Sequence, residues 1–146
     1  MATLTITVTE AVTLGDGSTD RGTTNTQTVT VDEVDHRIMD IPTSWVSIIK
    51  FAAANAAGTF ADGTVKHLRI TNLDSSNFLT VRVKTNNTEY FVKVEAEDHF
   101  ILGNTVMDGE SSTGFGNDVS FINIDEIQAK ADTAAVQVEY FVASAS

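Results

Sequence analysis

The sequence predicts an all-β protein: an antiparallel, jelly-roll-like β-sandwich of about eight strands, formed by residues 1–146 as a single domain. Three observations support this fold class. Apolar and polar residues alternate with a period of two in many segments, as they do in half-buried strands. Residues that suit pleated surfaces are abundant, with 21 threonines alone. Turn-forming residues recur about every ten positions, which is typical of a sandwich or barrel.

The N-terminal segment is expected to form the first strand. Threonine occupies the odd positions of residues 3–9, and the apolar residues share the even positions: Leu4, Ile6, Val8, Val12 and Leu14. This pattern predicts one buried face and one wet face. Because the strand is terminal, residues 1–14 could leave their own sheet and pair with the edge of a neighbouring subunit.

Further strands are expected over residues 28–34 and around residues 45–51, where both sides are apolar. Residues 52–64 are expected to be a loop with one helical turn at most, because the segment is too short for a stable helix. Residues 67–83, "HLRITNLDSSNFLTVRV", predict a hairpin with a polar turn, and "NNT" at 86–88 turns the chain again.

Later, Ile127 breaks the alternation that begins at Val119, which predicts a bulge. The last strand covers residues 136–142. One core is expected between the two sheets, made by Leu68, Ile70, Leu79, Val81, Val83, Val92, Val94, Val138 and Tyr140.

The residues that carry chemistry form no recognisable catalytic or cofactor-binding pattern. Cysteine is absent, and His36, His67 and His99 are not at metal-ligand spacing, so we expect ordinary surface or edge histidines. The carboxylates lie mostly in turns and at strand ends, and no nucleophile elbow, P-loop or dinucleotide motif occurs. The sequence therefore predicts no enzyme, no catalytic residue, no metal and no cofactor.

The loop at residues 15–25 leaves one alternative open. Asp16, Ser18 and Asp20 have the spacing with which some calcium loops begin. Gln27 stands where an EF-hand would place its closing glutamate, so a polar loop is the preferred interpretation.

The net charge of −11 argues against nucleic-acid binding, which depends on many basic residues. The sequence has neither an apolar stretch long enough for a membrane helix nor a secretory signal at its N-terminus, which favours a soluble protein without a membrane partner. Five of the nine basic residues fall in one 28-residue window: Lys66, Arg69, Arg82, Lys84 and Lys93. They are expected on neighbouring strands, either as ion pairs with acids such as Glu89 and Glu95 or as a docking patch for an acidic protein surface.

Three segments resemble small β-sandwich structural proteins of tailed-phage virions. They are "VKHLRITNLD" at 65–74, "NFLTVRV" at 77–83 and "VEYFV" at 138–142, and the resemblance covers about residues 60–146. It implies a non-enzymatic cement or decoration protein on the capsid surface, with the major capsid protein or other virion proteins as partners. It brings no catalytic residues.

We therefore expect a homo-oligomer, with a trimer favoured, that stabilises a shell through its loops at 15–25, 52–64 and 103–118. A tail or fibre component of the virion is the first alternative. A carbohydrate-binding sandwich is the alternative from another class, and it would expose aromatic residues on one face. Trp45, Tyr90 and Tyr140 lie within apolar strand patterns and are expected in the core.

Overall fold

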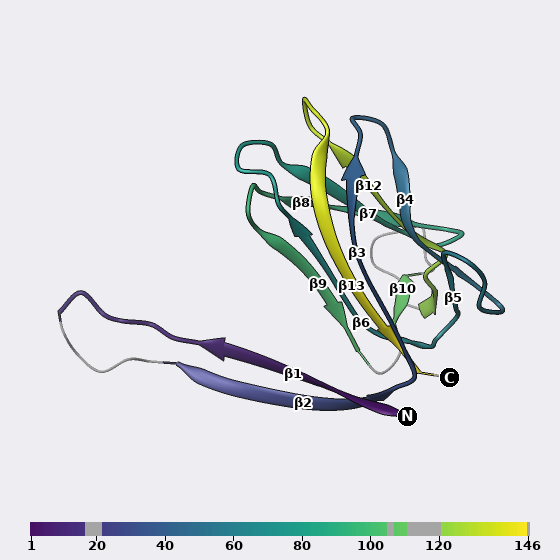
Figure 1. Cartoon of the computed structure of the whole chain (residues 1–146), viewed down its shortest axis with the longest axis horizontal. Coiled ribbons are helices and arrows are strands. Elements are labelled where there is room, and N and C mark those ends of the chain that lie inside the picture. Colours follow the sequence, from purple (N-terminus) through teal and green to yellow (C-terminus); the bar gives the residue numbers. More distant parts are fainter. Residues whose placement is uncertain (17–21, 105–106, 111–120, 146) are drawn as a thin grey trace.

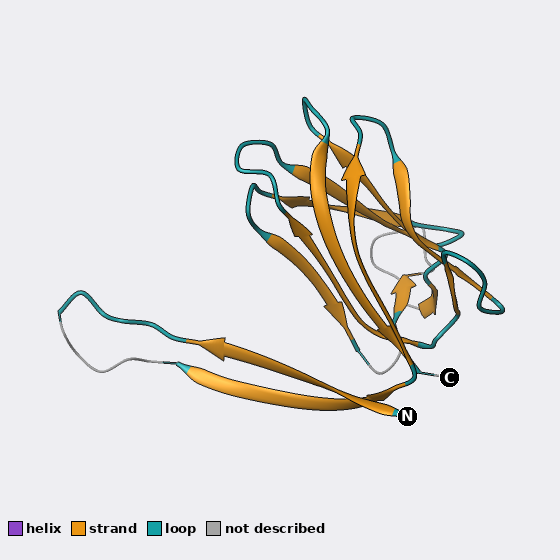
Figure 2. Cartoon of the chain, viewed as in Figure 1, coloured by secondary structure: helices purple, strands orange, loops and turns teal. Residues whose placement is uncertain are grey.

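The computed structural model describes residues 1–16, 22–104, 107–110 and 121–145. These residues form strands and no helix, which confirms the predicted all-β sandwich, and so none of them lies in a helix able to cross a membrane (Figure 1, Figure 2). The strands are β1 (Ala2–Glu10), β2 (Thr23–Val31), β3 (Glu33–Ile41), β4 (Val46–Ala52), β5 (Thr59–Ala61), β6 (Val65–Asn72), β7 (Leu79–Lys84), β8 (Glu89–Val94), β9 (His99–Gly103), β10 (Asp108–Glu110), β11 (Phe121–Asn123), β12 (Glu126–Ala131) and β13 (Val136–Ser144).

Two sheets face each other. One has the order β3-β13-β6-β9, and the other has the order β5-β4-β12-β7-β8. The strands expected near the N-terminus and over residues 45–51 and 136–142 are present as β1, β4 and β13, and the one expected at 28–34 is divided between β2 and β3. The short strands β5 and β10 were not expected.

The strand pairings are nested along the chain. β3 pairs with β13, β4 with β12, β6 with β9 and β7 with β8, and all four pairs are antiparallel. The chain is therefore one long hairpin whose tip is the β7–β8 turn. It is rolled so that β13 also pairs with β6, and β12 also pairs with β7.

The predicted core is confirmed. Leu79, Val81 and Val83 on β7 point inward. Eight of the nine predicted residues belong to one buried cluster, and the ninth, Val92, is partly buried and packs against it. Each such side chain that is fully buried contributes about 1.5–3 kcal/mol. The alternation along β7 predicted this core correctly, because the polar residues between the apolar ones, such as Thr80 and Arg82, point to the opposite face of the sheet.

The sequence predicted a hairpin at residues 67–83, and this prediction was wrong. β6 and β7 belong to different sheets, so the residues between them carry the chain across the sandwich. Asn72 is fully buried at this crossing and donates to the carbonyls of Asn77 (2.8 Å) and Glu95 (3.1 Å). The Asp74 carboxylate accepts from the backbone of Asn77 (2.7 Å) and Ser76 (2.8 Å), and these bonds lower its pKa.

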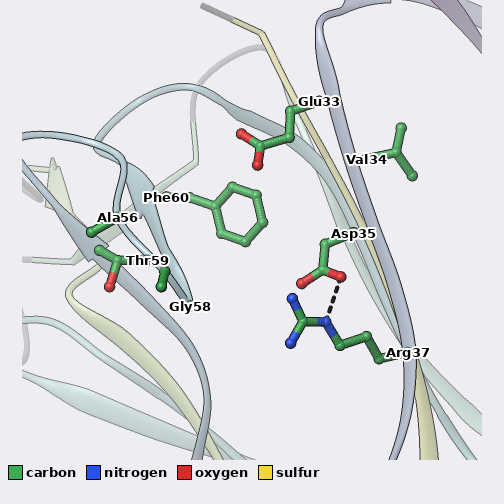
Figure 3. A pocket seen from close by; sticks show the side chains of 9 residues that line it. Glu33, Val34, Asp35, Arg37, Ala56, Gly58, Thr59 and Phe60 are labelled. Atoms are coloured by element: carbon green, nitrogen blue, oxygen red, sulfur yellow. Dashed lines mark hydrogen bonds and ion pairs between the residues drawn. The ribbon is translucent and has the colours of Figure 1, made fainter.

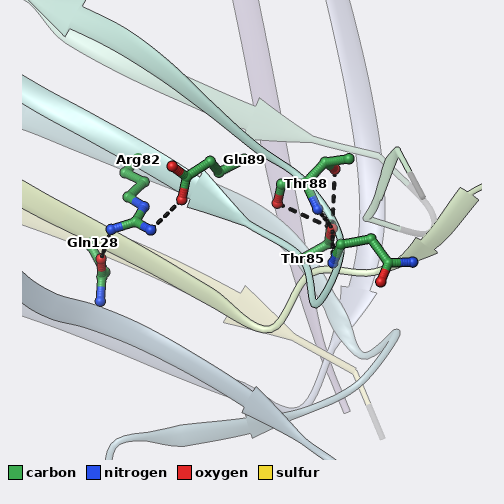
Figure 4. Close-up of polar contacts among 6 residues, drawn as sticks. Arg82, Thr85, Thr88, Glu89 and Gln128 are labelled. Carbon is green, nitrogen blue, oxygen red and sulfur yellow. Dashed lines mark hydrogen bonds and ion pairs between the residues drawn. The ribbon is translucent and has the colours of Figure 1, made fainter. Parts of the chain in front are cut away.

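The second predicted turn is a true hairpin between β7 and β8. Backbone N–H of Thr85 donates to the carbonyl of Thr88 at 2.9 Å, and the N–H of Thr88 donates to the Thr85 hydroxyl at 2.9 Å (Figure 4). These bonds satisfy the backbone within the turn.

The segment at residues 52–64 contains a strand where a loop or helical turn was expected. β5 pairs in parallel with β4, so the chain must reverse twice within a few residues. Gly58, between β4 and β5, and Gly63, between β5 and β6, have the positive φ values, 74° and 71°, that tight turns require. The bulge predicted at Ile127 is confirmed, because the β12–β4 register shifts between Ile127 and Gln128.

Candidate functional site

The arm, which consists of β1 and β2, projects away from the sandwich (Figure 1). Its two strands pair with each other over nine residues, from Ala2 opposite Val31 to Glu10 opposite Thr23. The register places threonine opposite threonine at four positions on one face, including Thr7 and Thr26 with hydroxyl oxygens 3.5 Å apart. The other face carries the apolar residues.

The expected buried face of β1 is not buried within this chain. Leu4 and Ile6 are half-buried, and Val8 is 53% exposed. Among the described residues, no second layer covers this two-stranded hairpin, and such a hairpin is marginal in water. The row of apolar side chains on this face, Leu4, Ile6 and Val8, therefore needs another layer to pack against. β1 pairs with its own chain, so the unit available for exchange is the hairpin rather than residues 1–14 alone.

The predicted basic patch is divided between two surfaces, because β6 lies in one sheet and β7 and β8 lie in the other. Lys66 donates to the carbonyl of Gly63 at 2.9 Å, and Arg69 forms an ion pair with Glu139 on β13. These two residues do not join Arg82, Lys84 and Lys93 in one patch. The ion-pair alternative is confirmed for Arg82 with Glu89 and for Lys93 with Glu95.

The structure creates a different group of cations on the outer face of the five-stranded sheet. Register places Lys50, Glu126, Lys84 and Glu89 side by side in one row. The neighbouring inward residues, such as Ile49 and Val83, are buried, so this row points outward. We call this surface the basic face, and its cations are Lys50, Arg82, Lys84, Lys93 and Lys130.

Arg82 lies at the centre of the basic face. It forms an ion pair with Glu89, and its Nη1 donates to Oε1 of Gln128 at 3.2 Å (Figure 4). Its guanidinium carbon lies 5.6 Å from the ring centroid of Trp45 and 5.8 Å from that of Phe91, which is cation–π geometry. The side chain is thus held in one position by four groups.

Trp45 and Phe91 are an aromatic pair that sequence reasoning missed. Their ring centroids are 5.8 Å apart, although β12 and β7 separate the strands that carry them. The two side chains must therefore reach over these strands. Trp45 is 39% exposed and Phe91 is 53% exposed. The expectation of core positions was wrong for Trp45 and Tyr90, and only Tyr140 is buried.

A second surface lies along β3, which forms one edge of the four-stranded sheet. We call it the acidic edge, formed by Glu33 and Asp35, which share one side of β3. A pocket of about 220 Å³ opens between β3 and the β5 segment, with Glu33, Asp35 and the Phe60 ring in its lining (Figure 3). Arg37 donates to Asp35 at 2.7 Å.

The Asp35 carboxylate is also anchored from inside the sandwich. The Tyr140 hydroxyl donates to it at 2.9 Å, and burial together with this bond raises the pKa of Tyr140 to about 12. Asp35 is therefore a structural part of the acidic edge, whereas Glu33 is exposed.

The histidines differ from the expectation at one position. His36 and His99 are exposed, but His67 is only 7% exposed and packs against the ring of Phe141. Gly103, which pairs with His67 across β6 and β9, leaves room for the imidazole: a Cβ there would lie 3.3 Å from Nδ1. Desolvation, with Arg69 adding to it, lowers the pKa of His67.

Among the residues that the structure describes, no three histidine, aspartate or glutamate side chains are grouped to hold a metal ion. Ser18 and Asp20 of the calcium alternative lie outside the described residues, as do Val119 and most of the loop at 103–118. Comparisons with protein-family models, with curated proteins and with solved structures find no match to this chain.

Proposed function

We propose that this chain is a non-enzymatic structural protein that assembles into a homo-oligomer and stabilises a larger shell by protein–protein contacts. A capsid cement or decoration protein of a tailed-phage virion, working as a trimer against the major capsid protein, is the specific form. The observation that carries the proposal is the arm, because Leu4 and Ile6 of its apolar row are only half-buried, Val8 is exposed, and its strands bond only to each other among the described residues.

The arm suits contact with a neighbouring copy. The chain has a net charge of −11, so two copies that approach through most of their surfaces repel each other. Between Ala2 and Thr9 on β1, and along the whole of β2, no side chain is charged. An apolar, neutral hairpin therefore offers association without like-charge contact.

The topology supports the same class of protein. We infer that the sandwich is a jelly roll, because its eight principal strands have the nested pairing expected of a rolled hairpin. This architecture is used by viral capsid and lectin domains. A tail or fibre component of the virion is the alternative within this class.

A carbohydrate-binding module is the second candidate function, and the exposure of Trp45 and Phe91 favours it. Their rings form a platform beside Arg82 and Gln128, which supply hydrogen-bonding groups. Sugar C–H groups stack on the negative face of aromatic rings. This candidate predicts binding to a glycan array by the full-length chain.

The test compares the full-length chain with a variant that lacks residues 1–31. Light scattering should give an oligomer for the full-length chain and a smaller species for the variant, while the melting transition of the sandwich persists. Co-sedimentation with virion particles that lack this protein should require residues 1–31. A full-length monomer that ignores such particles and binds glycans would replace the proposal with the second candidate.

A further inference from the structure

Two surfaces of opposite charge lie on different parts of this sandwich. We propose that the basic face of one copy docks on the acidic edge of the next copy, in a head-to-tail contact between identical chains. The proposal rests on the homo-oligomer proposed above and names a second contact within it, independent of the arm.

Charge distribution is the first argument. The basic face holds five of the nine basic residues, and the acids beside them are Glu89, Glu126 and Glu95, which pairs with Lys93. The remaining four basic residues share the rest of the chain with seventeen of its twenty acidic residues. The basic face is therefore the surface of this chain whose charge is complementary to an acidic surface on another copy.

The basic face also has the anchors that a protein contact needs. Trp, Tyr and Arg dominate the energetics of interfaces when they are held rigidly near the centre of a patch. Trp45, Phe91 and Arg82 meet at the centre of this face, and Arg82 is fixed by Glu89 and Gln128. Little side-chain entropy would be lost on docking.

The acidic edge offers a matching receptor. Its pocket combines the apolar Phe60 ring with the Glu33 carboxylate at the rim (Figure 3). A lysine side chain has the same two parts, an apolar stem and a charged tip. Lys84 or Lys130 of the next copy could place its stem against Phe60 and its ammonium group beside Glu33.

The two surfaces are different parts of the chain, so the contact is not self-complementary. One copy uses its five-stranded sheet and the other uses β3 at the edge of the four-stranded sheet. Head-to-tail contacts of this kind close into rings when the rotation permits. The favoured trimer is one such ring.

Charge reversal tests the contact in the full chain. The face variant carries Lys84→Glu and Lys130→Glu, and the edge variant carries Glu33→Lys. Each variant alone should weaken self-association at least about tenfold, because it places like charges in contact. A control with Glu97→Lys makes the same charge change as the edge variant on a turn outside both surfaces, and it should associate like the parent chain.

The decisive step is mixing the face variant with the edge variant. Each then presents its reversed surface to an oppositely charged partner, so equimolar mixing should restore association in assemblies where the two variants alternate. A ring of three copies cannot alternate, so the mixed assemblies should contain an even number of copies. Raising salt from about 0.1 M to about 1 M should weaken the same contact, because the Debye length falls from about 10 Å to about 3 Å. Restoration by mixing, with intact melting transitions, would establish head-to-tail docking.

Two results would overturn the inference. If both variants keep the parent oligomer while deletion of residues 1–31 dissociates it, the face-to-edge contact is wrong and the proposed function stands. If the parent chain is a monomer in low salt, the homo-oligomer itself is wrong. Binding of a polygalacturonate probe to that monomer, lost in the face variant, would assign the basic face to an acidic glycan instead.

Discussion

β1 and β7 have nearly the same sequence pattern and opposite surroundings. In β1, Leu4, Ile6 and Val8 alternate with threonine, and in β7, Leu79, Val81 and Val83 alternate with polar residues. The β7 residues are buried to 1% exposure or less, whereas Val8 on β1 is 53% exposed. The difference lies in what covers each strand, since β7 faces a second sheet and β1 has only β2 beside it. Alternation identifies a strand and its two faces, but it does not show whether the covering layer belongs to the same chain.

The largest difference in unfolding free energy is expected between a variant with a charge on β7 and a variant with a charge on β1. Val81→Asp should reduce the free energy of unfolding by about 3 kcal/mol or more, because an unpaired carboxylate would be buried. Ile6→Asp, on the arm, should leave the unfolding of the sandwich almost unchanged while it weakens oligomer formation. Urea unfolding and light scattering measure the two effects. Equal losses of stability would show that the arm folds as part of the core.

A smaller loss is expected at the crossing between the sheets. Asn72→Leu removes the donors to the carbonyls of Asn77 and Glu95 and leaves both acceptors without this partner. The expected cost is about 2–3 kcal/mol. Asn25→Leu, at an exposed position of the arm, is the matched control and should have no effect on sandwich unfolding. A neutral Asn72→Leu variant would mean that water replaces these bonds.

The burial of His67 predicts a modest pH dependence of stability that the exposed histidines should not cause. Its pKa is lowered in the folded state, so the unfolded chain binds the proton more readily. Stability should therefore fall as the pH drops below about 6.5, the ordinary pKa of histidine. In His67→Gln this part of the pH dependence should disappear, and in His36→Gln it should persist. Thermal melts between pH 5 and pH 8 measure both, and identical profiles for the two variants would contradict the assignment.

Chelation of metal ions is expected to have no effect on thermal stability. EDTA should leave the melting temperature of the full-length chain unchanged if the loop at 15–25 binds no calcium. A drop of more than about 5 °C, which corresponds to about 1–2 kcal/mol for a domain of this size, would point to Asp16, Ser18 and Asp20 as ligands. Re-addition of calcium, with magnesium as the control, would then identify the ion.

The core could be predicted from the sequence because its strands have one apolar face each. The crossing at residues 67–83 could not, since a hairpin and a connection between two sheets use the same turn residues. The basic patch was misplaced for the same reason, because neighbours in sequence such as Arg69 and Arg82 went to different sheets. Trp45 was misplaced because it lies just before β4 and its side chain reaches over the neighbouring strands toward Phe91, which no periodicity reveals.

The nested pairing has a consequence for folding during synthesis. β13 pairs with both β3 and β6, so a central strand of its sheet leaves the ribosome after the other strands of that sheet. Until it arrives, β3 has no partner in its sheet, and β6 has an unpaired edge that other chains can join. Pairing of β3 with β13 also closes a loop that contains most of the chain, which makes folding slow. The sandwich is therefore completed only after β13 has been synthesised, and loss of residues 137–146 would remove most of a central strand.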